Sequence, residues 1–299
     1  MRRDRSDHGF TLLEALIALA IFGLIAVMAT TGVVGALRAQ SLNEAIASSQ
    51  GRVRRVTEVF AQDLRSSVLG GLTNTPYASN DHQVSFLTLA GSGGNKVLPH
   101  DYGQGNSFSN ADNLFLVWSD PNTAATSLQG QHVLLVNDNG DATVFQVTNV
   151  APVAATTYRY NVVHAGCPNL IAYTDARTTA LASHSVGYRF DAGSGTLYLK
   201  DGSSAETPVA FDLSNVAIQY VYQTDAGAPL VRSAPLTDAS GYPVRTGTIS
   251  GQNVTLERVG LVVTASDGSA GRRVSRTVSS QVEMSSNPSF KIDKVTPCN

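Results

Sequence analysis

The feature that most constrains this chain is an uncharged apolar run from Ala15 to Leu37, 23 residues long. As a helix it measures roughly 34 Å at about 1.5 Å per residue, which is enough to cross the hydrocarbon core of a bilayer. A short polar leader with three arginines, Met1–His8, precedes it, and the chain becomes polar again at Arg38. The sequence therefore predicts a membrane-spanning helix near the N-terminus.

Glu14 lies directly before this run, where a carboxylate is costly unless it has a partner. No basic residue lies within the run, so two interpretations stay open: the side chain reaches the membrane interface, or it pairs with a group outside the run. An ordinary secretory signal has a shorter apolar stretch followed by a cleavage site. Here the run is too long for that, and we expect it to be retained as an anchor.

The segment Gly9–Glu14, with its basic leader, resembles the cleavage and methylation motif of type IV prepilins and type II secretion pseudopilins. The resemblance implies that a prepilin peptidase cuts between Gly9 and Phe10. It also implies N-methylation of Phe10 and a role for Glu14, the fifth residue of the mature chain, in assembly.

The helix is predicted to continue beyond the anchor, because apolar residues recur at spacings of three, four and seven. Gly70-Gly71 is a plausible stop, which gives one helix over residues 10–70. The apolar positions are Leu42, Ile46, Val53, Val56, Phe60, Leu64 and Val68. Arg52, Arg54 and Arg55 form a small basic cluster that we interpret as a solvated face, with Arg54 paired to Glu58.

From about residue 72 the pattern changes to short runs rich in Val, Leu, Phe, Tyr and Thr, bounded by turn residues. The predicted strands are Gln83–Ala90, Asn113–Trp118, His132–Asn137, Ala142–Val150, Thr157–His164, Ser185–Phe190, Thr196–Lys200, Val216–Gln223, Leu256–Ala265 and Arg273–Met284. The fold class is α+β: a long N-terminal helix, transmembrane and then amphipathic, packed on a mainly antiparallel β head. The domains are a leader (1–9), the helix (10–70) and a periplasmic head (71–299).

Turn signals add two hairpins to this prediction. Asn139-Gly140 predicts one hairpin, and Asp191–Gly195 predicts another. Outside the strands, the long polar segments Ser66–Leu98 and Asp225–Gly251 are predicted to be surface loops.

Two cysteines, Cys167 and Cys298, occur in the predicted head. In an exported domain such a pair suggests one disulfide, although free thiols remain an alternative because sequence does not show connectivity.

Charge argues against a bulk polyanion binder, since the net charge is −2 and only 15% of residues are charged. Arg272, Arg273 and Arg276 could contact nucleic acid, but a solvated strand edge is the favoured interpretation.

Other motifs give no chemistry. Gly91–Lys96 lacks the Gly-Lys-Ser/Thr ending of a phosphate loop. Asn137–Asp141 has calcium-type oxygens without a distal glutamate, and a turn explains it. His164 and Cys167 make neither a zinc site nor a catalytic pair. No nucleophile elbow occurs, so we expect no enzyme activity, no metal and no cofactor.

Parts of the head resemble the PilW family of minor pilins. They are Asp112–Val117, His132–Val136, Ala142–Thr148, Val186–Phe190, Ile218–Tyr222 and Glu257–Val263. The related J-type pseudopilins share the N-terminus and the feature Phe60–Arg65, but usually have shorter heads. The resemblance implies a minor pilin that primes type IV pilus assembly beside other minor and major pilins. It also implies inner-membrane anchoring through residues 15–37, with the N-terminus in the cytoplasm and the head in the periplasm. A type II secretion pseudopilin and a DNA-binding or adhesive tip pilin are the alternatives.

Overall fold

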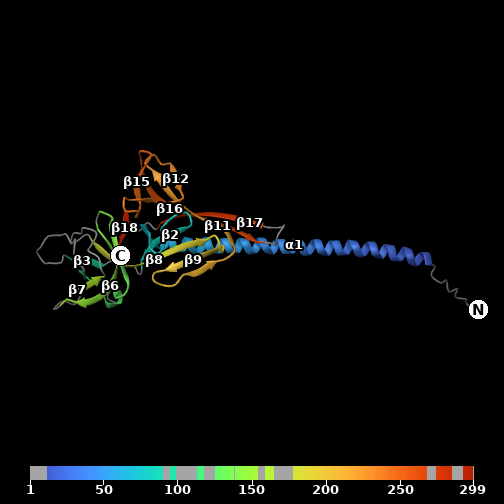
Figure 1. Ribbon diagram of the computed structural model, residues 1–299, viewed down its shortest axis with the longest axis horizontal. Coiled ribbons are helices and arrows are strands. Elements are labelled where there is room, and N and C mark those ends of the chain that lie inside the picture. The colour runs from blue at the N-terminus through green and yellow to red at the C-terminus, as the bar shows by residue number, and fades with distance from the viewer. Residues whose placement is uncertain are drawn as a thin grey trace, which may run out of the picture.

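The structure is a computed structural model that describes residues 12–89, 95–98, 113–117, 125–137, 139–153, 159–164, 178–267, 274–284 and 292–298. One long helix, α1, projects from a β-rich head, and the N-terminal end of the helix lies far from every strand (Figure 1). This is an α+β, pilin-like fold, as the sequence predicts.

Helix α1 (Leu12–Ser66) has 55 residues and is about 82 Å long at 1.5 Å per residue. Its buried residues begin only at Ser49 and include four members of the predicted stripe, Val53, Val56, Phe60 and Leu64. The first two members of the stripe are not buried against the head: Leu42 is exposed and Ile46 is only partly buried. About two thirds of the helix therefore stands clear of the head.

The prediction that Gly70-Gly71 ends the helix is wrong. The helix ends at Ser66, and the chain enters strand β1 (Ser67–Thr73), which contains both glycines. The hydroxyls of Ser66 and Ser67 donate to the carbonyls of Asp63 and Leu64, at 2.7 and 2.6 Å, and so satisfy acceptors of the last turn.

Gly70 has a different role from a helix stop. Its φ is +78°, and a Cβ there would lie 1.9 Å from the carbonyl oxygen of Ile292. The close approach of the C-terminal segment therefore requires glycine at this position.

The remaining elements follow in chain order. They are β2 (Gln83–Leu89), β3 (Asn95–Leu98), β4 (Asn113–Val117), the 3₁₀ turn η1 (Ala125–Leu128), β5 (His132–Val136), β6 (Asp141–Pro152), β7 (Arg159–His164), β8 (Thr179–Asp191), β9 (Thr196–Asp201), β10 (Thr207–Ala210), β11 (Leu213–Thr224), β12 (Pro229–Arg232), β13 (Leu236–Thr237), β14 (Pro243–Val244), β15 (Thr246–Ile249), β16 (Gln252–Asp267), β17 (Val274–Glu283) and β18 (Lys294–Pro297).

Two sheets form the head. The larger runs in the order β1-β2-β8-β3-β4-β7-β6-β18-β14-β13, with β5 between β8 and β6, and with β9 and β10 beyond β8. The smaller runs β12-β11-β16-β15, with β17 on β16. Among the described strands every pair is antiparallel except β18 with β6, so the predicted antiparallel character is confirmed.

Each of the ten predicted strands has a counterpart, and both hairpins are present. In the first hairpin Gly140 has φ +87°, and the Asn137 side-chain oxygen accepts from the backbone N–H groups of Asn139 and Asp141 at 3.0 and 2.9 Å. The loop predictions were wrong, because residues 66–98 hold β1 and β3 in addition to the predicted strand β2, and residues 225–251 hold four short strands, β12–β15. Strand β1 is buried along most of its length despite its small and polar residues.

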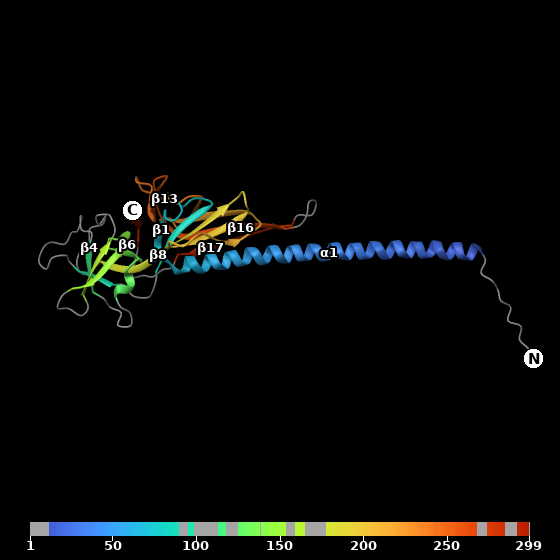
Figure 2. The same cartoon turned by 60° about the horizontal axis from the view of Figure 1, so that its bottom comes forward.

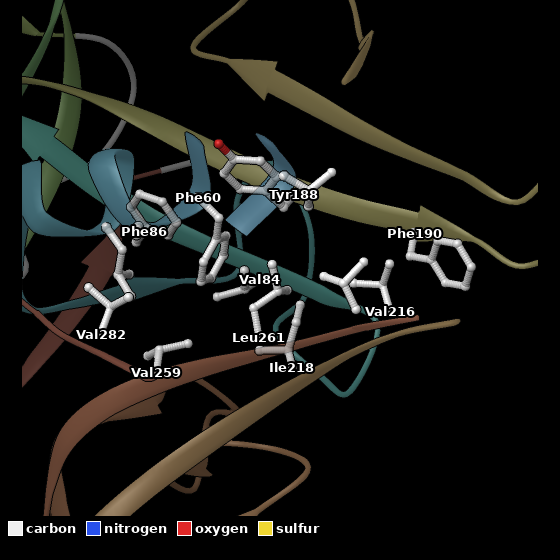
Figure 3. Close-up of a cluster of buried hydrophobic side chains, with 14 of the residues drawn as sticks. Phe60, Val84, Phe86, Tyr188, Phe190, Val216, Ile218, Val259, Leu261 and Val282 are labelled. Atoms are coloured by element: carbon white, nitrogen blue, oxygen red, sulfur yellow. The ribbon is translucent and has the colours of Figure 1, made fainter. Parts of the chain in front are cut away.

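The core beside the helix, which we call the helix-proximal core, lies between α1, the smaller sheet and strands β2 and β8. Figure 3 shows Phe60 of α1 among Phe86, Tyr188, Leu261 and Val282. A second buried cluster fills the part of the head that lies away from the helix, around Phe145 and Val162. We call it the distal core.

Candidate functional site: the projecting helix and its seat

The projecting part of α1 carries an uninterrupted exposed apolar surface. From Leu12 to Leu37 every large apolar side chain is exposed, from 38% at Val34 to 82% at Leu12. This helix is long and apolar enough to cross a membrane. Thr30 and Thr31 do not interrupt it, because their hydroxyls donate to the carbonyls of Ala26 and Val27 at 2.6 and 3.0 Å. Exposed apolar surface of this extent requires lipid or other helices around it.

Glu14 lies in the first turn of α1 and is exposed. The structure thus places the predicted assembly carboxylate at the N-terminal end of the apolar surface. Gly9 and Phe10, the predicted cleavage position, lie outside the described residues, so cleavage there stays a prediction.

The seat of the helix on the head is built around Phe60. Its ring centroid lies 5.2 Å from that of Tyr188 and 6.5 Å from that of Phe86, both in edge-on geometry. All three rings are fully buried. Burial of rings of this size contributes several kcal/mol, so this contact holds the C-terminal half of α1 to the sheets.

Two polar contacts supplement the apolar seat. Arg52 of α1 donates to Asp212 at 3.0 Å and to Asp267 at 2.7 Å. Tyr188 donates its hydroxyl to the carboxylate of Asp63. Burial raises the pKa of Asp63, while the bond from Tyr188 lowers it, and burial together with this carboxylate raises the pKa of Tyr188.

The predicted solvated basic face is confirmed for Arg54 and is wrong for Arg52. Arg54 pairs with Glu58 at 2.7 Å, and both side chains are exposed, as predicted. Arg52 is not a solvated side chain, since it joins the helix to Asp267 at the end of β16 and to Asp212 in the turn before β11. One signal was available, because Arg52 borders Val53 at the edge of the apolar stripe. Its partners lie 160 and 215 residues away in sequence, which helical spacing does not reveal.

Of the two cysteines of the predicted disulfide, the structure describes only Cys298. Cys167 lies outside the described residues, and so do Arg272 and Arg273. Cys298 packs against the distal core, and its N–H donates to the carbonyl of Val144 at 2.8 Å. The pairing stays a prediction. Within the described ranges no group of three or more His, Cys, Asp or Glu could hold a metal ion.

Comparison with known proteins gives one result. The family model of the prokaryotic N-terminal methylation motif matches residues 4–30. No curated protein and no solved structure matches the chain. The chain therefore carries a type IV pilin-type prepilin signal, and this signal continues into the exposed apolar part of α1. Signal and fold together define the class: a pilin- or pseudopilin-like protein that carries a prepilin signal. The finer resemblance to PilW receives no support from these comparisons.

Proposed function

We propose that the protein is a minor pilin of a type IV pilus, PilW-like, that helps to initiate assembly. The observation that supports it is the continuity of the prepilin signal at 4–30 with a helix whose first part is apolar and exposed. A prepilin peptidase would cut between Gly9 and Phe10 and leave the apolar helix on the mature chain. The chain would wait in the inner membrane with its head in the periplasm.

The proposed mechanism is mechanical, with no catalytic step. A helix that buries its first part in lipid can exchange lipid for neighbouring helices at little cost, because both surroundings are apolar. The seat around Phe60 and the ion pairs of Arg52 then fix how the head sits on that helix. The head would therefore take its place on the outside of the filament once the helix is packed in its centre.

A type II secretion pseudopilin is the alternative, since it would share the signal and the helix. The head predicted over residues 71–299 is longer than the heads that J-type pseudopilins usually have, which favours the pilus assignment. Deletion of the gene separates the two functions: loss of pili with normal secretion supports the pilus, and loss of secretion with normal pili supports the pseudopilin.

The direct test follows the chain from membrane to filament. In a piliated cell, mass spectrometry of the full-length gene product should show a mature chain that begins with methylated Phe10, in membranes and in sheared pili. A Gly9→Leu variant is the matched control and should stay unprocessed in the membrane and absent from pili. An intact Met1 leader on the wild-type protein, or a cut elsewhere, would overturn the proposal.

A further inference from the structure

Strand β17 forms an edge of the smaller sheet beside α1 (Figure 2). It pairs with β16 without a break in register, and across the described chain no backbone bond reaches its other side. Alternate residues of an edge strand direct both backbone groups outward. Natural edges are commonly protected by charged side chains, especially Lys, by Pro, by a bulge, or by a helix or loop that covers the edge. Strand β17 contains neither Lys nor Pro and is regular over ten residues, and its charged residues are Arg276 and Glu283 alone.

Strand β17 and helix α1 do not pack closely along their whole length. Two clefts of about 550 and 530 Å³ lie between α1 and β17, and they share Thr57 and Glu58. Strand β17 lines them with Arg276, Thr277, Val278 and Ser280, of which Arg276, Val278 and Ser280 share one face of the strand. Two residues further on that face, Val282 is buried in the helix-proximal core. The face that α1 covers at Val282 is therefore open at Val278, which is 42% exposed.

The open charges of these clefts are basic. Glu58 is already paired with Arg54 at 2.7 Å. Arg65 and Arg276 line the same clefts, and neither has an ion pair in the described part of the chain. A partner that complements this surface would carry carboxylates.

We infer that β17 receives an added strand: an extended, acidic segment of a neighbouring filament subunit. This rests on the proposed function, which supplies the neighbour. An added strand would satisfy the free backbone groups of β17, and its alternate side chains would enter the clefts over Val278. A helix satisfies its own backbone groups and would leave the edge unpaired, which is why an extended segment fits this site better.

The test uses full-length protein in a piliated cell. A photo-reactive amino acid is placed singly at Val278 and at Ser280, and cross-linked residues in sheared pili are mapped by mass spectrometry. We expect cross-links to one partner subunit, at positions two residues apart and close to Asp or Glu. Val231, 50% exposed on the opposite edge strand β12, is the matched control site and should not give this pattern.

Charge reversal provides the second arm. Arg276→Glu should lower the yield of the Val278 cross-link roughly tenfold, as a like-charge contact replaces an attraction. Arg276→Lys keeps the positive charge and should retain most of the wild-type cross-link yield. Arg232→Glu on β12 should leave the yield unchanged. Cross-links spaced three or four residues apart would show a helix and overturn the inference, as would cross-links to lipid alone. Mature protein in pili without any cross-link at β17 would overturn only this inference, whereas its absence from pili would overturn the proposed function too.

Discussion

Arg52 of α1 and Asp267 at the end of β16 lie 2.7 Å apart, measured from Nη2 to Oδ2. Ser49, the first buried residue of the helix, precedes Arg52 by less than one turn. The ion pair therefore marks the point at which the helix leaves the head. Nη1 of Arg52 lies 3.0 Å from Oδ2 of Asp212, which adds a second ion pair at the same place.

Removal of this tie should weaken the seat modestly. We expect Arg52→Ala to lower the free energy of unfolding by about 1 kcal/mol, the upper range for partly exposed pairs, and less at high salt. Urea unfolding of the full-length protein in detergent measures it. Arg54→Ala is the control, because its pair with Glu58 is exposed and lies within the helix, and it should have no measurable effect. Equal losses in both variants would show that Arg52 does not tie helix to head.

Tyr188→Phe should make stability more sensitive to pH. Burial raises the pKa of Asp63, so the folded chain keeps a proton that the unfolded chain releases above pH of about 4. The free energy of unfolding therefore falls as pH rises through the interval up to the raised pKa. Since the hydroxyl of Tyr188 lowers that pKa, its loss should extend the fall to higher pH.

At neutral pH the same variant should cost about 1–2 kcal/mol, because a half-buried carboxylate loses its donor. Urea midpoints between pH 4 and pH 7 test both effects. Tyr222→Phe is the control: its hydroxyl accepts from the N–H of Leu236 at 2.8 Å, and its loss should be the same at every pH. Parallel pH profiles for the two variants would contradict the assignment to Asp63.

Glu206 should produce the opposite dependence in acid. Arg189 binds its carboxylate through two nitrogens, at 3.1 and 2.7 Å, and Tyr77 donates to it as well. These bonds lower the pKa of Glu206 to about 2. The contribution to stability is complete above the ordinary glutamate pKa of about 4.3 and is lost as pH falls toward 2.

Glu206→Gln should remove this part of the acid transition, so that the free energies of unfolding of variant and wild type approach one another as pH falls from about 4 to about 2. Acid titration of the urea midpoint measures the convergence. Glu257→Gln is the control, because its carboxylate lies 4.0 Å from Arg258 in a single contact, and it should follow the wild type. A constant difference between Glu206→Gln and wild type at every pH would refute this account.

The helix, its apolar stripe, the ten strands and both hairpins followed from sequence, because each depends on local periodicity or turn residues. Strand β1 did not, since Val68 also fits the helical spacing from Leu64. The burial predicted for Val68 is confirmed, but it packs with Leu87 and Leu134 and not along the helix. At the candidate site Glu14 could be predicted from a motif. The partners of Arg52 could not, because contacts across 160 and 215 residues depend on how the sheets pack.

The disulfide makes a prediction about non-additivity. A Cys167–Cys298 bond would close a loop of about 130 residues and stabilise by roughly 5 kcal/mol in the chain-entropy model, an upper figure. Cys167→Ser and Cys298→Ser should then cost the same, and the double variant should cost no more than either. Thiol labelling of the unreduced, denatured protein provides the check, and two reactive thiols would show that the bond is absent.

Glu14 should set the register of assembly. Cleavage after Gly9 would create a positive amine on Phe10, four residues before Glu14 in apolar surroundings. When helices pack with an axial stagger, the Glu14 carboxylate of one subunit can approach the amine of the next. Desolvation cancels much of the attraction, but a wrong stagger would leave both charges unpaired, at a cost of several kcal/mol.

We therefore expect Glu14→Ala and Glu14→Gln to leave membrane insertion and cleavage intact and to impair entry into the filament. Glu14→Gln keeps the size of the side chain and removes only its charge, so it separates charge from packing. Glu44→Gln is the matched control, because Glu44 lies on the same helix beyond the apolar run and its carboxylate accepts from Gln40 at 3.0 Å. Sheared pili are compared with membranes in which mass spectrometry confirms the processed chain. Wild-type amounts of either Glu14 variant in the filament would show that this carboxylate does not set the register, because the unpaired amine would then carry no measurable cost.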